Sequence, residues 1–333
     1  MRSPNFWYNN PAFLAWSLSP LGWLYSWATA QRLNNVTAVV RAQCPVICIG
    51  NVNAGGTGKT PTIIAMVEHL QKLGRTAAVV SRGYGKSLKV PTLVNPLVHS
   101  SDQVGDEPLL IAAFCQTIVT NNRVAGIELA SKCKPDVILM DDGFQDPTVY
   151  KDFSIITVDA SLGFGNGFCI PAGPLREPIV TGLRRADMCL SIGSKENQKF
   201  FSEKLAVPLD VAHVNAEIKP LLTGMRWVGL NAYAFAGIAH PGKFFRTLEG
   251  LGVNILDREA LSDHQPLSLR LLRRMSAKAK SLNAQLVCTE KDFVRIPVDY
   301  RTEVLVLPVR LEIEDWSKID LKLADLGPVS YTH

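Results

Sequence analysis

Short apolar runs and longer stretches of helical periodicity alternate along the first part of the chain. The apolar runs predict buried β-strands, because aliphatic and β-branched residues occupy successive positions in them. The predicted strands are residues 45–49, 76–80, 117–120, 136–140, 153–158 and 188–192. The predicted helices are residues 62–73, 109–115 and 122–132. This alternation is typical of an α/β fold, in which helices cover both faces of a parallel sheet.

A second, shorter α/β pattern follows, and a segment of different character separates the two. Residues 206–227 combine scattered prolines with alternating polarity, which predicts a linker or hairpin. The second pattern predicts strands at 232–238, 286–289 and 304–307 and helices at 241–251 and 267–282. We therefore expect four segments: an N-terminal segment (1–31), a first α/β domain (32–205), a linker or hairpin (206–228) and a smaller α/β lobe (229–333) that faces the first domain across a cleft.

A glycine-rich loop joins the first predicted strand to the first predicted helix. Glycines there let backbone N–H groups turn onto phosphate oxygens at a helix N-terminus. Lys59 would reach the β- and γ-phosphates, and the Thr60 hydroxyl would bind Mg²⁺. The expected nucleotide-binding residues are Asn53, Ala54, Gly55, Gly56, Thr57, Gly58, Lys59 and Thr60. Asn53 stands where a P-loop usually has its first glycine, yet the strand–loop–helix context favours a phosphate site over an incidental glycine turn.

Two acidic residues, Asp141 and Asp142, directly follow the apolar strand predicted at 136–140. Such a pair is often a solvated turn, but downstream of a P-loop it is the Walker B arrangement that holds Mg²⁺ against the phosphates. The loop at 53–60, the segment at 81–85 and this acidic pair all follow predicted strands. Because ligands of open parallel sheets bind at the carboxyl ends of the strands, we expect these three motifs to lie together.

Two further polar positions each allow two interpretations. Asp106 and Glu107 precede a predicted helix, where acidic residues favour the helix dipole, or Asp106 is a general base that takes a hydroxyl proton. His264 lies in the sequence Ser-Asp-His-Gln-Pro, which is also typical of a capped helix start. The spacing does not show that Asp106 and His264 meet.

The segment at 168–178 is rich in proline and contains the adjacent residues Arg176 and Glu177. It is either a structural loop locked by an ion pair or a rigid segment that presents Arg176 to a phosphate group.

The N-terminal segment has an unusual composition. Residues 3–31 contain no charged side chain and hold four of the six tryptophans. Tryptophan favours membrane interfaces, and Pro20 and several serines interrupt the apolar run, so we expect a helix that lies in a membrane surface. The alternative is a helix packed on the protein's own core. A signal peptide is not expected, because no basic region and cleavage site bracket a short apolar core.

Charge and cysteine content exclude several classes of protein. The net charge of +5 is compatible with an acidic substrate or an anionic membrane, and no basic block with interleaved aromatics indicates nucleic acid. The seven cysteines are scattered and form no CxxC pair, so they predict reduced thiols in place of a disulfide framework or zinc site.

Eight motifs then occur in the order typical of the tetraacyldisaccharide 4′-kinase family, and the chain resembles that family over nearly its whole length. They are GNVNAGGTGKTP, SRGYG, GDEP, DDGFQ, PAGPLREP, FAGIAHPGKFF, DHQP and TEKD. The resemblance implies a P-loop kinase of two α/β lobes on the cytoplasmic face of the Gram-negative inner membrane. It implies transfer of the γ-phosphoryl group of ATP, with Mg²⁺, to the 4′-hydroxyl of a tetraacylated glucosamine disaccharide 1-phosphate.

The resemblance also implies roles for individual residues. A catalytic Asp–His pair is carried onto Asp106 and His264, and Lys59 and Arg176 act on the phosphates. Residues expected near the substrate are Ser81, Arg82, Tyr84, Glu107, Arg123, Gln145 and Glu177. The family often has histidine where this chain has Asp146. The expected partners are the glycolipid and a membrane surface, with no nucleic acid and no obligate protein partner.

The main rival is a membrane-associated switch ATPase or GTPase. The P-loop of partitioning ATPases carries a signature lysine near its start, and this loop starts at Asn53 with no lysine beside it. GTPases read guanine with Asn-Lys-x-Asp, whereas the sequence Thr-Glu-Lys-Asp at 289–292 has the wrong spacing. A third class, a non-catalytic membrane adaptor, would leave the phosphate-binding motifs unexplained.

Overall fold

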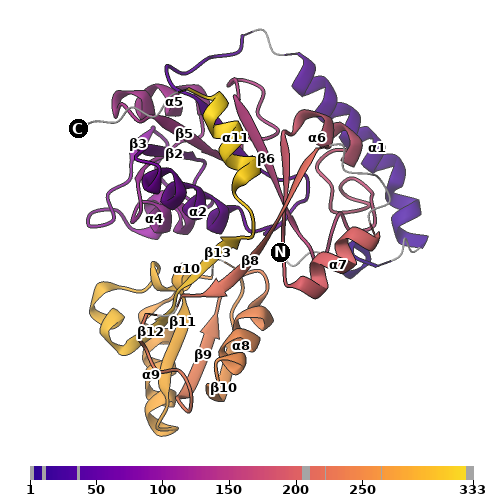
Figure 1. Cartoon of the computed structure of the whole chain (residues 1–333). Coiled ribbons are helices and arrows are strands. Elements are labelled where there is room, and N and C mark those ends of the chain that lie inside the picture. The colour runs from indigo at the N-terminus through magenta and orange to yellow at the C-terminus, as the bar shows by residue number, and fades with distance from the viewer. Residues whose placement is uncertain are drawn as a thin grey trace.

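Two sheets of different size form the two lobes of the molecule (Figure 1). The computed structural model describes residues 4–9, 13–35, 38–204, 211–221, 223–263 and 265–327. Helices flank both sheets, and the long helix α1 (Phe13–Asn34) lies along the outside of the larger lobe. The predicted α/β class with a second, smaller lobe is therefore confirmed.

The larger sheet has nine strands in the order β13-β8-β7-β6-β1-β5-β2-β4-β3. Their bounds are β1 Val46–Gly50, β2 Ala77–Ser81, β3 Thr92–Leu93, β4 Gln116–Val119, β5 Val137–Asp141, β6 Phe153–Asp159, β7 Met188–Ile192, β8 Ala212–Pro220 and β13 Val309–Ile313. The pairings from β8 through β4 are parallel, and only β13 and β3 add antiparallel edges. Strand β1 is central and wholly buried, because every residue in it is apolar or glycine.

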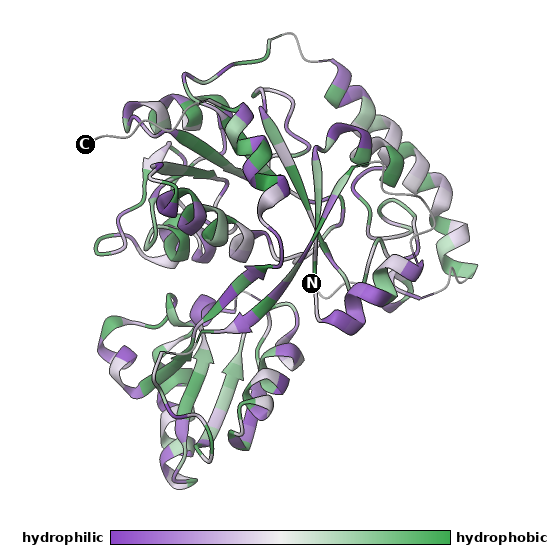
Figure 2. Cartoon of the chain, viewed as in Figure 1, coloured by the Kyte–Doolittle hydropathy of each residue, from purple (hydrophilic) through white to green (hydrophobic). Residues whose placement is uncertain are grey.

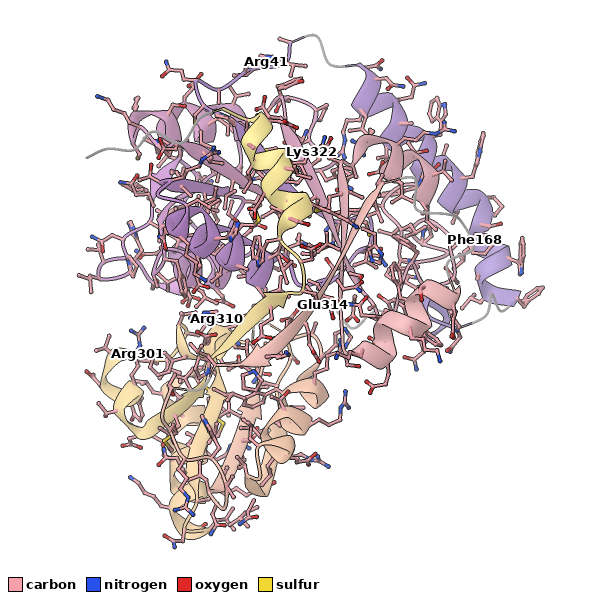
Figure 3. The ribbon with its side chains drawn as sticks, viewed as in Figure 1. Arg41, Phe168, Arg301, Arg310, Glu314 and Lys322 are labelled. Atoms are coloured by element: carbon pink, nitrogen blue, oxygen red, sulfur yellow. The ribbon has the colours of Figure 1, made fainter. Side chains whose placement is uncertain are left out.

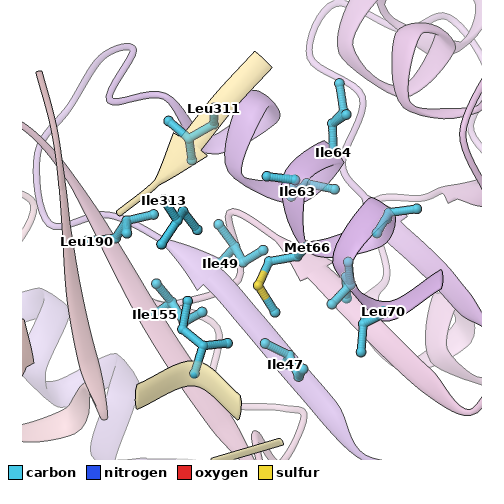
Figure 4. Packing of buried hydrophobic residues seen from close by; sticks show 14 of the residues in the cluster. Ile47, Ile49, Ile63, Ile64, Met66, Leu70, Ile155, Leu190, Leu311 and Ile313 are labelled. Carbon is cyan, nitrogen blue, oxygen red and sulfur yellow. The ribbon is translucent and has the colours of Figure 1, made fainter. Parts of the chain in front are cut away.

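Helices cover both faces of this sheet. They are α2 Lys59–Lys72, α3 Ser101–Val104, α4 Asp106–Ile111, α5 Arg123–Lys132, α6 Ile179–Arg185, α7 Lys195–Lys204 and α11 Ser317–Asp325. On one face Ile63, Met66 and Leu70 of α2 pack against Ile47 and Ile49 of β1 (Figure 4). Burying a side chain of this size contributes about 1.5–3 kcal/mol. The strand that precedes the P-loop and the helix that follows it are thus fixed to each other by the core.

The smaller sheet has four parallel strands in the order β10-β9-β11-β12. Its elements are β9 Asn231–Ala236, α8 Pro241–Gly250, β10 Asn254–Ala260, α9 Leu269–Ser281, β11 Gln285–Thr289, α10 Glu290–Phe293, η2 Val298–Glu303 and β12 Val304–Leu307. The sequence did not indicate β10. It is an edge strand with no buried residue and a charged sequence, so it lacks the apolar run that marks the other strands.

The segment expected as a linker or hairpin is different in the structure. Residues 212–220 form β8, which pairs with β7 and extends the larger sheet. The chain also returns to the larger lobe after β12, because β13 pairs with β8 and α11 packs beside α2. The smaller lobe is thus inserted between β8 and β13 rather than continuing to the C-terminus. The alternating polarity of residues 212–220 reflects a partly exposed strand near a sheet edge.

Helix α1 follows a short 3-10 turn, η1 (Asn5–Trp7). Among the residues that the structure describes, no helix is long and apolar enough to cross a membrane. Figure 2 shows how polar α7 is by comparison with the strands of both sheets, which are mostly hydrophobic. All seven cysteines are free, and burial raises the pKa of the Cys48 thiol to about 12.

Candidate active site

The P-loop leaves the start of α2 open to an anion. Gly58 is the N-cap of α2 and has φ 87°, a left-handed conformation that glycine adopts without strain. A Cβ atom there would lie 2.6 Å from Ile192 Cδ1, so a larger residue would also have to displace that side chain. Gly58 provides no side-chain cap, and the first N–H groups of α2 therefore have no side-chain acceptor from it. Phosphate oxygens fit that requirement.

Buried polar contacts hold the loop in this shape. Thr57 Oγ1 lies 2.8 Å from Thr157 Oγ1 on β6, and Asn51 donates to Thr57 Oγ1 at 3.0 Å. The Asn53 side-chain amide donates a hydrogen bond to the Gly163 carbonyl, which ties the start of the loop to the segment that follows β6. The sequence analysis missed Asn51 and Thr157. A polar residue directly after the apolar run of β1 was the available signal for Asn51.

Lys59, Asp142 and Arg176 form one charged group beside the loop. Asp142 Oδ1 lies 3.6 Å from Lys59 Nζ and 2.7 Å from an Arg176 guanidinium nitrogen. Burial opposes ionisation of Asp142, but Lys59 and Arg176 outweigh it and lower the pKa of Asp142 to about 2. One ionised carboxylate therefore holds the side chains of Lys59 and Arg176 together beside the P-loop.

Asp141 differs from its neighbour. Ser81 donates a hydrogen bond of 2.6 Å to Asp141 Oδ2, whereas the buried Oδ1 has no hydrogen-bond partner among the described residues. Burial, reinforced by the charge of Glu107, raises the pKa of Asp141 to about 6. A buried carboxylate oxygen without a partner is costly unless a ligand completes it.

The residues present fit a magnesium ion that is shared with a nucleotide. The described residues contain no group of three or more His, Cys, Asp or Glu side chains that could hold a metal alone. Mg²⁺ at phosphate sites takes most of its ligands from phosphates and water, with one or two from protein. The unpartnered oxygen of Asp141 and the hydroxyl of Thr60 have the required hard-oxygen chemistry.

Three residues expected near the substrate make contacts that support the residues around the site. Arg123 is 2% exposed and donates to the main-chain carbonyls of Val80, Asp141 and Asp142, so it fastens the ends of β2 and β5. Glu177 is buried and forms an ion pair with Arg185. Gln145 donates to Glu177 and to the Asn51 carbonyl.

These contacts also correct the picture of the 168–178 segment. No Arg176–Glu177 ion pair locks it, because Arg176 contacts Asp142 and Glu177 contacts Arg185. The segment is held by its backbone, in which the Arg176 N–H donates to the Val52 carbonyl and the Pro174 carbonyl accepts from Ala54. Arg176 is thus presented to the phosphate side of the site.

The loop after β2 carries side chains that face solvent. Arg82 is exposed, and its guanidinium group lies 3.7 Å from Asp146 Oδ2. Tyr84 is also exposed. Of the residues expected at the substrate, these two have the accessibility that contact with a bound molecule requires.

A second charged group forms where the smaller lobe meets α4. Glu107 Oε1 lies 3.1 Å from Lys291 Nζ, and Asp263 Oδ1 lies 3.7 Å from the same ammonium. Asp106 is buried, and its Oδ2 lies 3.5 Å from Arg295 Nε. The predicted His264 lies outside the described residues. Its neighbour Gln265 accepts a hydrogen bond from Arg295, which also contacts Asp106.

The two charged groups face the same space. Glu107 belongs to the charged group between the lobes, and its negative charge raises the pKa of Asp141 beside the P-loop. A Cβ atom on Gly56 of the P-loop would lie 3.9 Å from Ala239 Cβ of the smaller lobe, and Lys243 Nζ lies 2.6 Å from Asp159 Oδ2 at the end of β6. The smaller lobe therefore closes one side of the phosphate site.

The fold and this site define an ATP-dependent kinase of the P-loop class. The chain matches the family model described as tetraacyldisaccharide-1-P 4′-kinase over residues 14–326, and it belongs to that family. It is 51% identical to the tetraacyldisaccharide 4′-kinase of Dinoroseobacter shibae, with 98% of each chain covered. It is 47% identical to the enzyme of that name from Jannaschia sp., covering 96% of this chain and 97% of the relative. The family resemblance read from the motifs is confirmed.

A solved structure agrees in fold. LpxK from Aquifex aeolicus, crystallised in complex with ATP, has a TM-score of 0.76 and 22% identity, covering 94% of this chain and 99% of that one.

Proposed function

We propose that this chain transfers the γ-phosphoryl group of ATP to the 4′-hydroxyl of a tetraacylated glucosamine disaccharide 1-phosphate, which gives the bisphosphorylated lipid A precursor. The observation that carries the proposal is the orphaned oxygen of Asp141, a carboxyl group on which the charges of Lys59 in the P-loop and of Glu107 in α4 both act. Family membership supplies the substrate.

The donor side of the reaction uses residues of the larger lobe. The N–H groups at the start of α2, Lys59 and Arg176 neutralise the phosphate oxygens and hold the γ-phosphoryl group in place. Preorganised charges of this kind stabilise charge that spreads over the transferring group. Asp141 and Thr60 would hold Mg²⁺, which would supply positive charge to neutralise the phosphates. Asp142 keeps the two cations oriented.

The acceptor side uses Asp106, with His264 as its expected partner. Asp106 takes the proton of the 4′-hydroxyl as that oxygen attacks the γ-phosphorus. It lies at the first position of α4, where the helix dipole favours a carboxylate. The positively charged guanidinium group of Arg295 also lies beside the Asp106 carboxylate. Arg82 and Tyr84, on the exposed loop after β2, are placed to contact the sugar or its phosphate.

Helix α1 supports a membrane-bound substrate. Its small residues Ala15, Gly22 and Thr29, two turns apart, are buried against the larger lobe. A Cβ on Gly22 would lie 2.8 Å from the Cys169 carbonyl oxygen, so the contact is close. Its large side chains face outward, with Phe13 88% and Trp23 71% exposed. Small residues inward and large apolar residues outward are the reverse of a helix packed on a core.

We infer that α1 lies in the cytoplasmic surface of the Gram-negative inner membrane. This holds the site at the height of the lipid headgroup while the acyl chains stay in the bilayer. Such positioning contributes to the rate because the acceptor hydroxyl then meets the γ-phosphoryl group in line. Phe168, which Figure 3 places beside α1, packs edge-on against Trp16 with ring centroids 5.1 Å apart.

The membrane proposal is tested by liposome flotation. The double variant Trp23→Ser, Trp27→Ser removes outward apolar area without touching the buried seam, so it should float poorly while it still binds ATP. Leu321→Ser, which removes an equally exposed apolar residue from α11, is the matched control and should float like the parent. Normal flotation of the double variant would place the membrane contact elsewhere.

The reaction is tested with γ-labelled ATP and a Gram-negative lipid extract. The proposal expects label in a glycolipid, and Lys59→Ala should abolish that incorporation. Release of all label as free phosphate would instead support the rival switch ATPase or GTPase.

A further inference from the structure

Arg295 of the smaller lobe contacts groups from both sides of the acceptor site. We propose that Arg295 is a positioning residue for phosphoryl transfer, because it holds Asp106 and the main chain at Gln265 in the geometry in which the acceptor hydroxyl loses its proton. The inference rests on the proposed function, since it takes Asp106 as the base.

One guanidinium group makes all of these contacts. Arg295 donates to the Gln265 carbonyl at 2.8 Å and to the Gly237 carbonyl at 3.1 Å, and it forms a close ion pair with Asp292. Its Nε lies 3.5 Å from Asp106 Oδ2 on the other lobe. The side chain is 4% exposed, so these groups are its surroundings rather than water. Nε has no hydrogen-bond partner among the described residues and points its charge at Asp106.

The contacts on the smaller lobe are themselves fixed. Asp292 accepts hydrogen bonds from the Gly237 N–H at 2.9 Å and from the Thr289 hydroxyl at 2.6 Å. Burial raises the pKa of Asp292, and the charge of Arg295 opposes that rise. The planar guanidinium group of Arg295 is held by Gln265, Gly237 and Asp292, so it has little freedom to reorient. The position of Arg295 relative to Asp106 is therefore set by the docking of the lobe.

A second arginine provides the matched comparison. Arg310 on β13 also bridges α2 and α10, with its guanidinium nitrogens 3.1 Å from Glu68 and 3.1 Å from Glu290. Figure 3 places it where the two lobes meet. Its hydrogen bonds to described residues go to Glu68, Glu290 and its neighbour Val309, and none goes to Asp106 or Gln265. If Arg295 only fastened the lobes together, its loss would resemble the loss of Arg310.

The test compares steady-state kinetics of Arg295→Met and Arg310→Met in the full-length protein. Misplacing a catalytic group by about 1 Å costs roughly 10²-fold in rate, so we expect a kcat loss of that order for Arg295→Met. The KM for ATP should not change, because Arg295 touches no residue of the P-loop. Arg310→Met should keep nearly all of its kcat. Equal losses in the two variants would overturn the inference.

A double-mutant cycle gives the sharper readout. In an Asp106→Asn background, Arg295→Met should cause no further loss of kcat, because the residue through which it acts is already disabled. A further loss as large as in the parent would contradict the proposal. If Arg295→Met does not fold, Arg295→Lys carries the same cycle, since lysine keeps the charge but lacks the fork.

The two proposals fail in different ways. Full activity of Asp106→Asn would refute the assignment of the base and thus the proposed mechanism. An inactive Asp106→Asn together with a fully active Arg295→Met would refute only the positioning role.

Discussion

The donor half of the site and the acceptor half are built in different ways. The donor half consists of the P-loop, Asp141, Asp142 and Arg176, all of which belong to the larger lobe and are held by β1, α2 and β5. The acceptor half combines Asp106 of α4 with Lys291 and Arg295 of the smaller lobe. The named residues of the donor half all belong to one lobe, whereas those of the acceptor half come from two lobes. Nucleotide binding and phosphoryl transfer should therefore be separable by mutation.

The interlobe contacts are weaker than the core that supports the P-loop. Lys243–Asp159 and the pairs of Arg310 are partly exposed ion pairs. Pairs of this kind contribute about 0–1 kcal/mol each. Loss of one of these exposed pairs should thus have little effect on the stability of the protein.

The largest effect is expected from Asp106→Asn. Loss of a general base lowers the rate by roughly 10²–10⁴-fold, and we expect kcat to fall within that range. Steady-state assays with detergent-dispersed lipid acceptor measure it, with Asp102→Asn on the neighbouring helix α3 as a control that should stay active. A kcat for Asp106→Asn near that of the parent would contradict the assignment of the base.

Lys59→Ala should come next. Removing one preorganised contact to the transferring group costs on the order of 10²–10³ in kcat. Lys59 also neutralises the bound phosphates, so the dissociation constant for ATP should rise as well. Lys72→Ala, at the far end of the same helix, is the control and should behave like the parent. Retention of both activity and ATP affinity in Lys59→Ala would remove the P-loop from the mechanism.

The difference between the halves also explains what the sequence could predict. β1, α2 and β5 are marked by unbroken apolar runs and a glycine-rich loop, so the donor half was located from neighbouring residues alone. Asn51 and Thr57, in contrast, hold the loop through Thr157 on β6. Thr157 is far from them in the sequence, so the sequence does not indicate this contact. β8, β10 and β13 lie near or at sheet edges, where half-exposed positions weaken the hydrophobic signal.

Even less of the acceptor half could be predicted from the sequence. Asp106 was found as a candidate because of the helix start and the family resemblance. Nothing in the sequence pairs it with Arg295, since the contact depends on how the inserted lobe folds back onto α4. Arg123 and Glu177 were expected at the substrate but are buried supports, because a polar residue near a strand end has the same pattern whether it faces inward or outward.

A smaller effect should follow Thr57→Val. The substitution removes the hydrogen bonds that the Thr57 hydroxyl makes with Asn51 and Thr157, and a hydrogen bond of this kind contributes about 0.5–1.5 kcal/mol. Thermal unfolding should show the lower stability, and ATP affinity should fall because the loop is less well held. Thr57→Ser keeps the hydroxyl and should retain both. Unchanged stability in Thr57→Val would mean that these contacts do not hold the loop.

Arg310→Met should have the smallest effect. It removes ion pairs that contribute about 0–1 kcal/mol each, so the loss in kcat should stay well below tenfold. Calorimetric unfolding and steady-state kinetics would check both values. A loss as large as that of Asp106→Asn would show that lobe docking, and not the residues at Asp106, limits the rate.

The separation of the two halves is tested most directly by titrating ATP into Asp106→Asn in an isothermal calorimeter. The account predicts the same dissociation constant for ATP as in the parent protein, although this variant transfers almost no phosphoryl group. A loss of ATP affinity as large as that of Lys59→Ala would contradict it, because the acceptor half would then be part of the nucleotide site.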